Sequence, residues 1–291
     1  MNIYTPDFDK KDLQLIANKG MQVSDIQKQI ELFKTGVPSI NIVEAATIKN
    51  NGIKKISGEI SEYYRNKYIK KKETSRVIKF VPASGAATRM FKDIFEYVES
   101  EKDDLPANIS ELTENINKLA FEDEINKILK ANGSSLVNEL KTKNYKKLLD
   151  IIISDKGLNY GNLPKGLILF HKYDNENRTA FEEHIAESIM HATTENGSKI
   201  HFTVSPEHKE RFIELANKLI PKYEITYKTK IEINFSIQNP ATDTIAVDPE
   251  NKPFRNADGS LLFRPAGHGA LIENLNSIDQ DIIFIKNIDN I

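Results

Sequence analysis

The sequence predicts an α/β protein in which helices flank a mostly parallel sheet, and two observations favour this fold class. Short apolar runs rich in β-branched residues, typical of buried strands, alternate with amphipathic helical stretches from residue 76 onward. Consecutive strands lie about 30 residues apart, which leaves room for a crossover helix between parallel neighbours. At 291 residues, of which 39% are hydrophobic, the chain can bury the core that such a fold needs.

The N-terminal region, residues 1–75, is predicted to be mostly helical. Apolar residues recur at helical spacing from Ile26 to Phe33, and Ser24 is the expected N-cap of this helix. A second amphipathic stretch covers residues 52–72 and ends in three lysines, which suit the negative end of a helix dipole.

The remaining chain, residues 76–291, forms the predicted α/β domain. Strand patterns cover residues 76–82, 166–173, 199–205, 230–238 and 281–289, and helical patterns cover residues 178–193, 206–220 and 269–278. The sequence from Asn256 to Gly259 predicts a hairpin turn. An uninterrupted helical pattern over about residues 94–156 is interpreted as an insertion into this domain.

Composition excludes several classes of function. The formal net charge is −2, so the basic stripe that a nucleic-acid-binding protein usually shows is missing. The absence of cysteine removes disulfides, thiolate catalysis and cysteine-ligated zinc. No apolar run approaches the roughly 18 residues of a membrane span, and the first residues do not resemble a signal peptide. We therefore expect a cytoplasmic protein without nucleic-acid or membrane partners.

The segment after the first strand, "ASGAATRM", is the first candidate for a binding site. Small residues let the backbone approach a ligand closely, and the N–H groups at the start of a following helix favour phosphate. Arg89 and Lys92 add positive charge at this point. The same pattern is also typical of an ordinary strand–helix turn with solvated cations beside it.

Two glycine-containing segments are further candidates. Pro164 and Gly166 fix a turn around Lys165, which can direct its ammonium group at one spot or form a common surface turn. Gly267 and Gly269 flank His268 before a helix, so a flat ligand could contact the backbone there. The alternative is a helix entry with one polar side chain. His268 has no second ligand at metal-binding spacing.

Asp289 ends the last predicted strand. Ligands of open α/β sheets bind at the carboxyl ends of strands, where a carboxylate can hold Mg²⁺ against phosphates. An aspartate in this position is also a common turn former.

The order of these segments resembles that of the UDP-sugar pyrophosphorylases. The motifs "ASGAATRM", "LPKG", "NFSIQNP", "RPAGHGALIENL" and "FIKNIDN" follow one another over about residues 76–291. The set is most similar to the UDP-N-acetylglucosamine pyrophosphorylase and UTP–glucose-1-phosphate uridylyltransferase group of nucleotidyltransferases. The resemblance implies a Rossmann-like, GT-A-like sheet. We expect the chain to belong to a bacterial family of unknown function within this superfamily.

The resemblance also implies roles for individual residues. It implies a triphosphate, with UTP favoured, cradled by a loop that comprises Ser84, Gly85, Ala86, Ala87, Thr88 and Arg89. Lys165 would neutralise charge on the phosphates, and Arg89 and Lys165 are the expected catalytic residues. The base and sugar would be contacted by Gln238, Gly267, His268 and Gly269. Asp289 would hold Mg²⁺ while a sugar 1-phosphate attacks the α-phosphorus and pyrophosphate leaves.

The chain departs from this family in three respects. Ser84 and Ala87 stand where the family has glycines. Met90 and Pro164 are separated by 73 residues, whereas the corresponding segments of the family lie close together. The chain ends two residues after Asp289, whereas enzymes of this group continue, so the resemblance implies either a piece of a longer protein or the loss of half of the site. Two alternative functions stay open: a nucleotide- or sugar-binding module without turnover, and a helical interaction scaffold that docks through residues 94–156.

Overall fold

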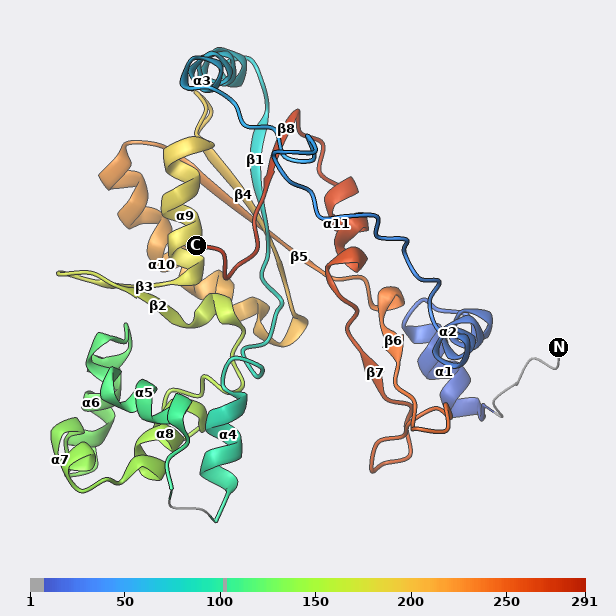
Figure 1. Cartoon of the computed structure of the whole chain (residues 1–291), viewed down its shortest axis with the longest axis vertical. Coiled ribbons are helices and arrows are strands. Elements are labelled where there is room, and N and C mark those ends of the chain that lie inside the picture. The colour runs from blue at the N-terminus through green and yellow to red at the C-terminus, as the bar shows by residue number, and fades with distance from the viewer. Residues whose placement is uncertain (1–7, 102–103) are drawn as a thin grey trace. The chain divides into compact units, whose positions relative to one another are not determined.

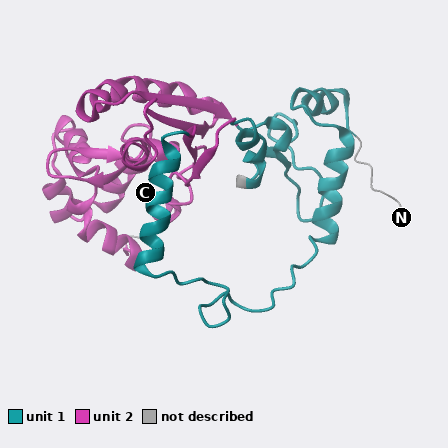
Figure 2. Ribbon diagram, turned by 90° about the horizontal axis from the view of Figure 1, so that it is seen from above, with its two compact units in different colours: residues 1–74, 238–278 teal, residues 75–237, 279–291 magenta. Residues whose placement is uncertain are grey.

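The computed structural model describes residues 8–101 and 104–291, with the exception of the His268 side chain. The chain divides into two compact units (Figure 2). Unit 1 contains residues 1–74 and 238–278, and unit 2 contains residues 75–237 and 279–291. Residues 238–278, which the strand–helix pattern places in the α/β domain, therefore group with the N-terminal region.

Unit 2 is built on a four-stranded, fully parallel sheet (Figure 1). Its strands are β1 (Val77–Pro82), β4 (Ser198–Val204), β5 (Ile231–Ile237) and β8 (Ile282–Ile285), and their order across the sheet is β5-β4-β1-β8. Lys79 of β1 lies opposite Ile200 of β4 on one side and Phe284 of β8 on the other. The predicted α/β class is thus confirmed, with the first and last predicted strands hydrogen-bonded to each other.

The direction in which strands are added reverses at β1. The chain proceeds from β1 to β4 and β5 on one side, and then places β8 on the opposite side of β1. In open parallel sheets such a reversal opens a crevice at the carboxyl ends of the two strands that flank it. The crevice expected here lies between the segment that follows β1 and the segment that follows β8.

Two helices cover one face of this sheet (Figure 1). They are α9 (Ala180–His191) and α10 (Lys209–Tyr227), and their apolar side chains pack on alternate residues of β1, β4 and β5. The rings of Phe181 on α9 and Phe202 on β4 lie 4.4 Å apart, and both side chains are fully buried. Because α9 leads into the amino end of β4, its own N-terminus lies at the carboxyl edge of the sheet.

The predicted strand over 166–173 forms outside this sheet. The short 3₁₀ helix η2 (Lys165–Leu167) leads into β2 (Leu169–Lys172), which pairs antiparallel with β3 (Asn177–Thr179). The polar residues between β2 and β3 favour a tight turn over a crossover helix, so the strand pairs with its immediate neighbour. The hairpin leads directly into α9.

The segment interpreted as a helical insertion is helical in the structure and has its own core. Its helices are α4 (Lys92–Glu99), α5 (Ala107–Glu114), η1 (Ile116–Lys118), α6 (Glu122–Ala131), α7 (Leu136–Lys141) and α8 (Tyr145–Ile153). Apolar residues at helical spacing, including Ile125, Leu129, Leu148 and Ile152, are fully buried between these helices. The insertion lies beyond the carboxyl edge of the sheet (Figure 1).

Unit 1 combines N-terminal helices with a small hairpin. Its elements are α1 (Lys10–Asn18), α2 (Val23–Thr35), α3 (Gly58–Lys72), η4 (Pro240–Thr242), β6 (Thr244–Ile245), β7 (Phe263–Arg264), η5 (His268–Leu271) and α11 (Ile272–Asn276). Ile16, Ile26 and Leu261 share its apolar core. The predicted N-cap Ser24 is wrong: the N-cap of α2 is Gln22, two residues earlier, and the Asp25 carboxylate accepts from the Gln22 backbone N–H at 3.0 Å.

The hairpin over 256–259 occurs as predicted. The backbone turns at Gly259, whose φ of 83° favours glycine. The neighbouring Arg255 donates two hydrogen bonds, of 2.8 and 2.7 Å, to the buried Asp12 carboxylate of α1. No helix in the described part of the chain has both the length and the apolar character needed to cross a membrane.

Candidate functional site

The segment that follows β1 forms an exposed loop whose two ends are anchored by backbone hydrogen bonds. Ala83 N donates to Thr203 O of β4 at 2.8 Å, and Ala87 N donates to Leu163 O at 3.2 Å. Between these anchors Gly85 and Ala86 are exposed and Ser84 is half-buried. A Cβ atom built on Gly85 would meet no atom within 4 Å. Apart from the Gly85 carbonyl, which accepts from Lys165 N–H, the backbone of Gly85 and Ala86 is therefore open to a ligand.

Arg89 lies in the turn that closes this loop. Met90 N and Phe91 N both donate to Ala87 O, and α4 begins only at Lys92. Thr88 and Arg89 are exposed, and neither forms a hydrogen bond or ion pair with another residue that the structure describes. Lys92 instead pairs with Glu96 one helical turn further on, at 3.5 Å. Of the two cations in this segment, only Arg89 keeps its charge available to a ligand.

Three of the predicted segments meet at this edge of the sheet. The Lys165 backbone N–H donates to Gly85 O at 3.1 Å, and its ammonium group lies 2.5 Å from the Asp289 carboxylate. Both side chains of this ion pair are partly exposed. Gly166 is needed for packing, since a Cβ atom there would lie 2.8 Å from the Phe212 ring. The loop, the lysine turn and the aspartate thus form one continuous surface, although they lie far apart in the sequence.

The remaining predicted residues belong to unit 1. The Gln238 side-chain amide donates to Ala266 O at 3.3 Å, which ties it to the segment that carries Gly267 and Gly269. Both glycines are exposed, with no atom within 4 Å of a Cβ built on them. The side chain of His268 lies outside the described residues. The structure therefore brings these residues together within their own unit.

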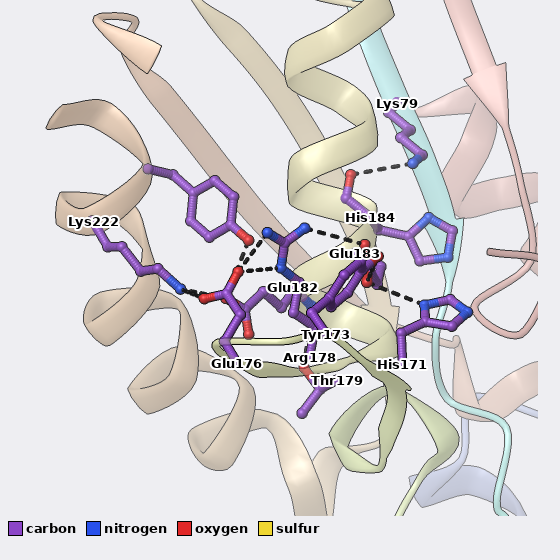
Figure 3. A network of polar contacts seen from close by, with 11 residues as sticks. Lys79, His171, Tyr173, Glu176, Arg178, Thr179, Glu182, Glu183, His184 and Lys222 are labelled. Carbon is purple, nitrogen blue, oxygen red and sulfur yellow. Dashed lines mark hydrogen bonds and ion pairs between the residues drawn. The ribbon is translucent and has the colours of Figure 1, made fainter. Parts of the chain in front are cut away.

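A buried charge cluster under the site was missed by the sequence analysis (Figure 3 shows part of it). Lys79, in the middle of β1, is fully buried, and its ammonium group donates to His184 O at 3.1 Å and to Glu187 of α9. Lys286, just after β8, donates to the same carboxylate. Burial lowers the pKa of Lys79 to about 8. Burial opposes ionisation of Glu187, but hydrogen bonds from Lys286 and Lys79 outweigh it and lower its pKa to about 2.

His184 connects this cluster to the Asp289 segment. Its Nε2–H donates to Ile288 O at 3.1 Å, one residue before Asp289. The ring is fully buried, and Nδ1 has no hydrogen-bond partner among the described residues. Burial, together with the Lys79 charge, lowers the pKa of His184 to about 4, so the imidazole is neutral at pH 7. The single lysine in the apolar run of β1 was the only sequence signal for this cluster.

A second polar network joins the N-terminus of α9 to the β2–β3 hairpin (Figure 3). The almost fully buried Glu183 carboxylate lies 3.1 Å from His171 Nδ1, accepts from Tyr173 OH at 2.7 Å and lies 3.6 Å from Arg178. Glu182, beside it, accepts from the Lys222 ammonium group at 3.1 Å. The carboxylates suit the positive end of the α9 dipole. Chemically, this network holds the His171 ring in one orientation.

The described side chains offer no preformed metal centre, because no group of three or more His, Cys, Asp or Glu residues among them is arranged to hold an ion. In a comparison with protein families, residues 9–291 match the family described as "Domain of unknown function (DUF4301)". Among curated proteins and among solved structures, no match to the chain was found.

Proposed function

The chain belongs to the DUF4301 family, and from the geometry of its site we propose that it binds a nucleoside triphosphate and transfers the nucleotidyl group to a sugar 1-phosphate, with release of pyrophosphate. One observation carries the proposal. The strand order reverses between β1 and β8, and the open loop after β1 meets the Lys165–Asp289 pair at the carboxyl ends of these two strands. The proposed fold class of unit 2 is correspondingly GT-A-like.

The loop after β1 is the proposed triphosphate site. Arg89 and Lys165 supply positive charge, and the exposed backbone at Gly85 and Ala86 can approach phosphate oxygens. Catalysis in such a site consists mainly of alignment and charge stabilisation.

Mg²⁺ is the cofactor that the proposal requires, and Asp289 is the residue that would hold it. A single carboxylate suits Mg²⁺ only when phosphates and water complete the coordination, and the described residues offer no larger acidic cluster. When bound, the ion would neutralise charge on the phosphates. The residues thus fit an ion that arrives with the nucleotide, and the contact between Lys165 and Asp289 would loosen as phosphates enter.

The base and the sugar are assigned by resemblance. Gln238 and Gly267 would contact the base, with UTP favoured, and His268 and Gly269 would lie near the sugar. Both sets belong to unit 1.

A binding module without turnover is the second candidate. It is favoured by the pairing of Asp289 with Lys165, because a carboxylate that is neutralised by a lysine binds a cation less well. In that case a nucleotide would bind through the same loop without being converted.

The test combines binding with turnover. A nucleoside triphosphate with Mg²⁺ should raise the melting temperature; at a ligand concentration of 100 Kd the stabilisation is about 2.7 kcal/mol. Arg89→Ala and Lys165→Ala should each weaken this effect. Arg65→Ala, which removes an exposed guanidinium group of α3, is the matched control. Equal thermal shifts in the wild type and both site variants would refute the assignment.

Turnover is followed as pyrophosphate release with a panel of sugar 1-phosphates and the four common triphosphates. Release that is lost in Asp289→Asn supports the transferase. Nucleotide binding without release across the panel supports the binding module.

A further inference from the structure

A pocket of about 440 Å³ lies in the helical insertion, beside the proposed triphosphate site. It is enclosed by the end of the loop after β1, by α4 and α5, and by the start of β2. Its walls are almost entirely apolar and include Phe91, Ile109, Leu112, Phe121, Ile168 and Phe170. This volume and this lining are typical of small-molecule sites, in which a few polar groups fix the orientation of a ligand.

The polar groups of this insertion pocket are confined to one pair. Asp93 in the first turn of α4 accepts a hydrogen bond from the side-chain amide of Asn108 on α5. The second carboxylate oxygen of Asp93 and the carbonyl oxygen of Asn108 are both acceptors. Both side chains are exposed, so a ligand can reach these oxygens. The pair thus offers two acceptors beside an apolar pocket.

The pocket is close to both cations of the proposed site. Met90, which lines the pocket, directly follows Arg89, and Ile168 follows Lys165 by three residues. Three residues of extended chain span at most about 11 Å. A ligand whose phosphates lie between Arg89 and Lys165 can therefore place an adjoining group in the pocket.

We propose that the insertion pocket binds the base of the nucleotide, and that the acceptors of Asp93 and Asn108 select guanine. This inference rests on the proposed nucleotide site. It replaces the base assignment by resemblance, because it places the base in the insertion pocket instead of at Gln238 and Gly267, and names guanine in place of the uracil of UTP. The faces of a base are apolar and can pack against aromatic side chains. Guanine presents two adjacent N–H donors, at N1 and at the 2-amino group, to these acceptors. Uracil presents one N–H flanked by carbonyl oxygens, which would face the acceptors and lose their hydrogen bonds to water.

Guanosine without phosphates tests the pocket directly. We expect it to bind the wild-type chain in calorimetry and to bind more tightly than uridine. Asp93→Asn should weaken guanosine binding about tenfold, since a bidentate contact to a base is worth about that factor in discrimination. Asp123→Asn, an exposed aspartate in the first turn of α6 that does not line the pocket, is the matched control and should leave binding unchanged. Leu112→Trp, which fills the pocket, should abolish binding, with the fold checked by circular dichroism.

The outcomes separate this inference from the proposed function. If guanosine binds in a way that depends on Asp93 but the chain releases no pyrophosphate, guanine binding in the pocket is supported and the proposed transferase activity is refuted. If triphosphate binding depends on Arg89 but is the same for every base and in Asp93→Asn, the pocket does not bind the base. The proposed triphosphate site would still stand. Decyl phosphate is the probe for the rival occupant, an aliphatic chain. If decyl phosphate binds, loses its binding in Leu112→Trp and is not displaced by guanosine, the guanine assignment is overturned.

Discussion

The two polar regions at the carboxyl edge of the unit 2 sheet differ in how their charges are satisfied. At the N-terminus of α9, Glu183 has partners in His171, Tyr173 and Arg178, and the carboxylate is almost fully buried. In the loop after β1, Arg89 is exposed and has no partner among the described residues. The first region holds structural elements together, whereas the second keeps its interactions available for a ligand.

The buried cluster of Lys79, Glu187 and Lys286 belongs with the first region. Burying a charge is costly unless it is paired, and here one carboxylate serves two lysines. If the comparison holds, substitutions in the paired regions change stability, and substitutions in the loop change ligand binding. The predictions below test this from the largest expected effect to the smallest.

Glu187→Gln should have the largest effect. It leaves the fully buried Lys79 ammonium group without a carboxylate, and breaking a buried pair in this way costs several kcal/mol. Because Glu187 is itself partly exposed, we expect the lower end of that range, about 3 kcal/mol, in urea denaturation. Glu96→Gln, which breaks an exposed pair on α4, is the control and should cost less than about 1 kcal/mol. Similar losses in the two variants would contradict a special role for the buried cluster.

His184 should make stability depend on pH. Its pKa in the folded state is about 4, below the ordinary value of 6.5, so the unfolded chain binds more protons between these values. The free energy of unfolding therefore falls as the pH falls from 6.5, by about 2–3 kcal/mol at pH 4.5. His184→Gln should flatten this slope by that amount. Denaturation of both proteins at several pH values is the measurement, and parallel slopes would show that the His184 ring is not buried in its neutral form.

Tyr173→Phe should have a smaller effect on the α9 network. It removes one hydrogen bond to Glu183, which keeps His171 and Arg178 as partners, so we expect a loss of about 1 kcal/mol. Tyr63→Phe, at an exposed position on α3, is the control for loss of a hydroxyl group. An unchanged unfolding midpoint in Tyr173→Phe would mean that Glu183 is held by its other partners alone.

The sequence predicted the parallel sheet because short apolar runs rich in β-branched residues alternate with helical stretches. The run from Val77 to Pro82 is buried at every residue, as its continuous apolar pattern indicates. The strand at 169–172 pairs in a hairpin instead, since a strand pattern does not specify its partner. The grouping of 238–278 with unit 1 depends on long-range contacts, such as Ile245 N to the Gln29 side chain at 2.8 Å, that no local pattern encodes.

The candidate site was predictable in part. Gly85 and Asp289 were predicted at one edge, because the carboxyl ends of parallel strands meet there. Lys165 follows no strand of this sheet, and only the resemblance placed it near the phosphates. The charge cluster was not predictable, since Lys79 looks like any solvated lysine until the strands on both sides of β1 are known. The pocket likewise depends on how α4, α5 and β2 pack, which helical periodicity does not determine.

Arg89→Ala should have the smallest effect on stability and so gives the sharpest contrast with Glu187→Gln. The side chain is exposed and has no hydrogen bond or ion pair with a described residue, so the ligand-free protein should unfold within about 0.5 kcal/mol of the wild type. The same variant should lose most of the thermal shift produced by a triphosphate with Mg²⁺. A structural residue would show the opposite pattern, with a large loss without ligand and an unchanged shift with it. Urea denaturation without nucleotide and thermal unfolding with it, on the same preparations, distinguish the two. A marked loss of stability without ligand would show that Arg89 stabilises the fold as the paired residues do. The contrast between paired and available charges, on which the proposed site depends, would then not hold.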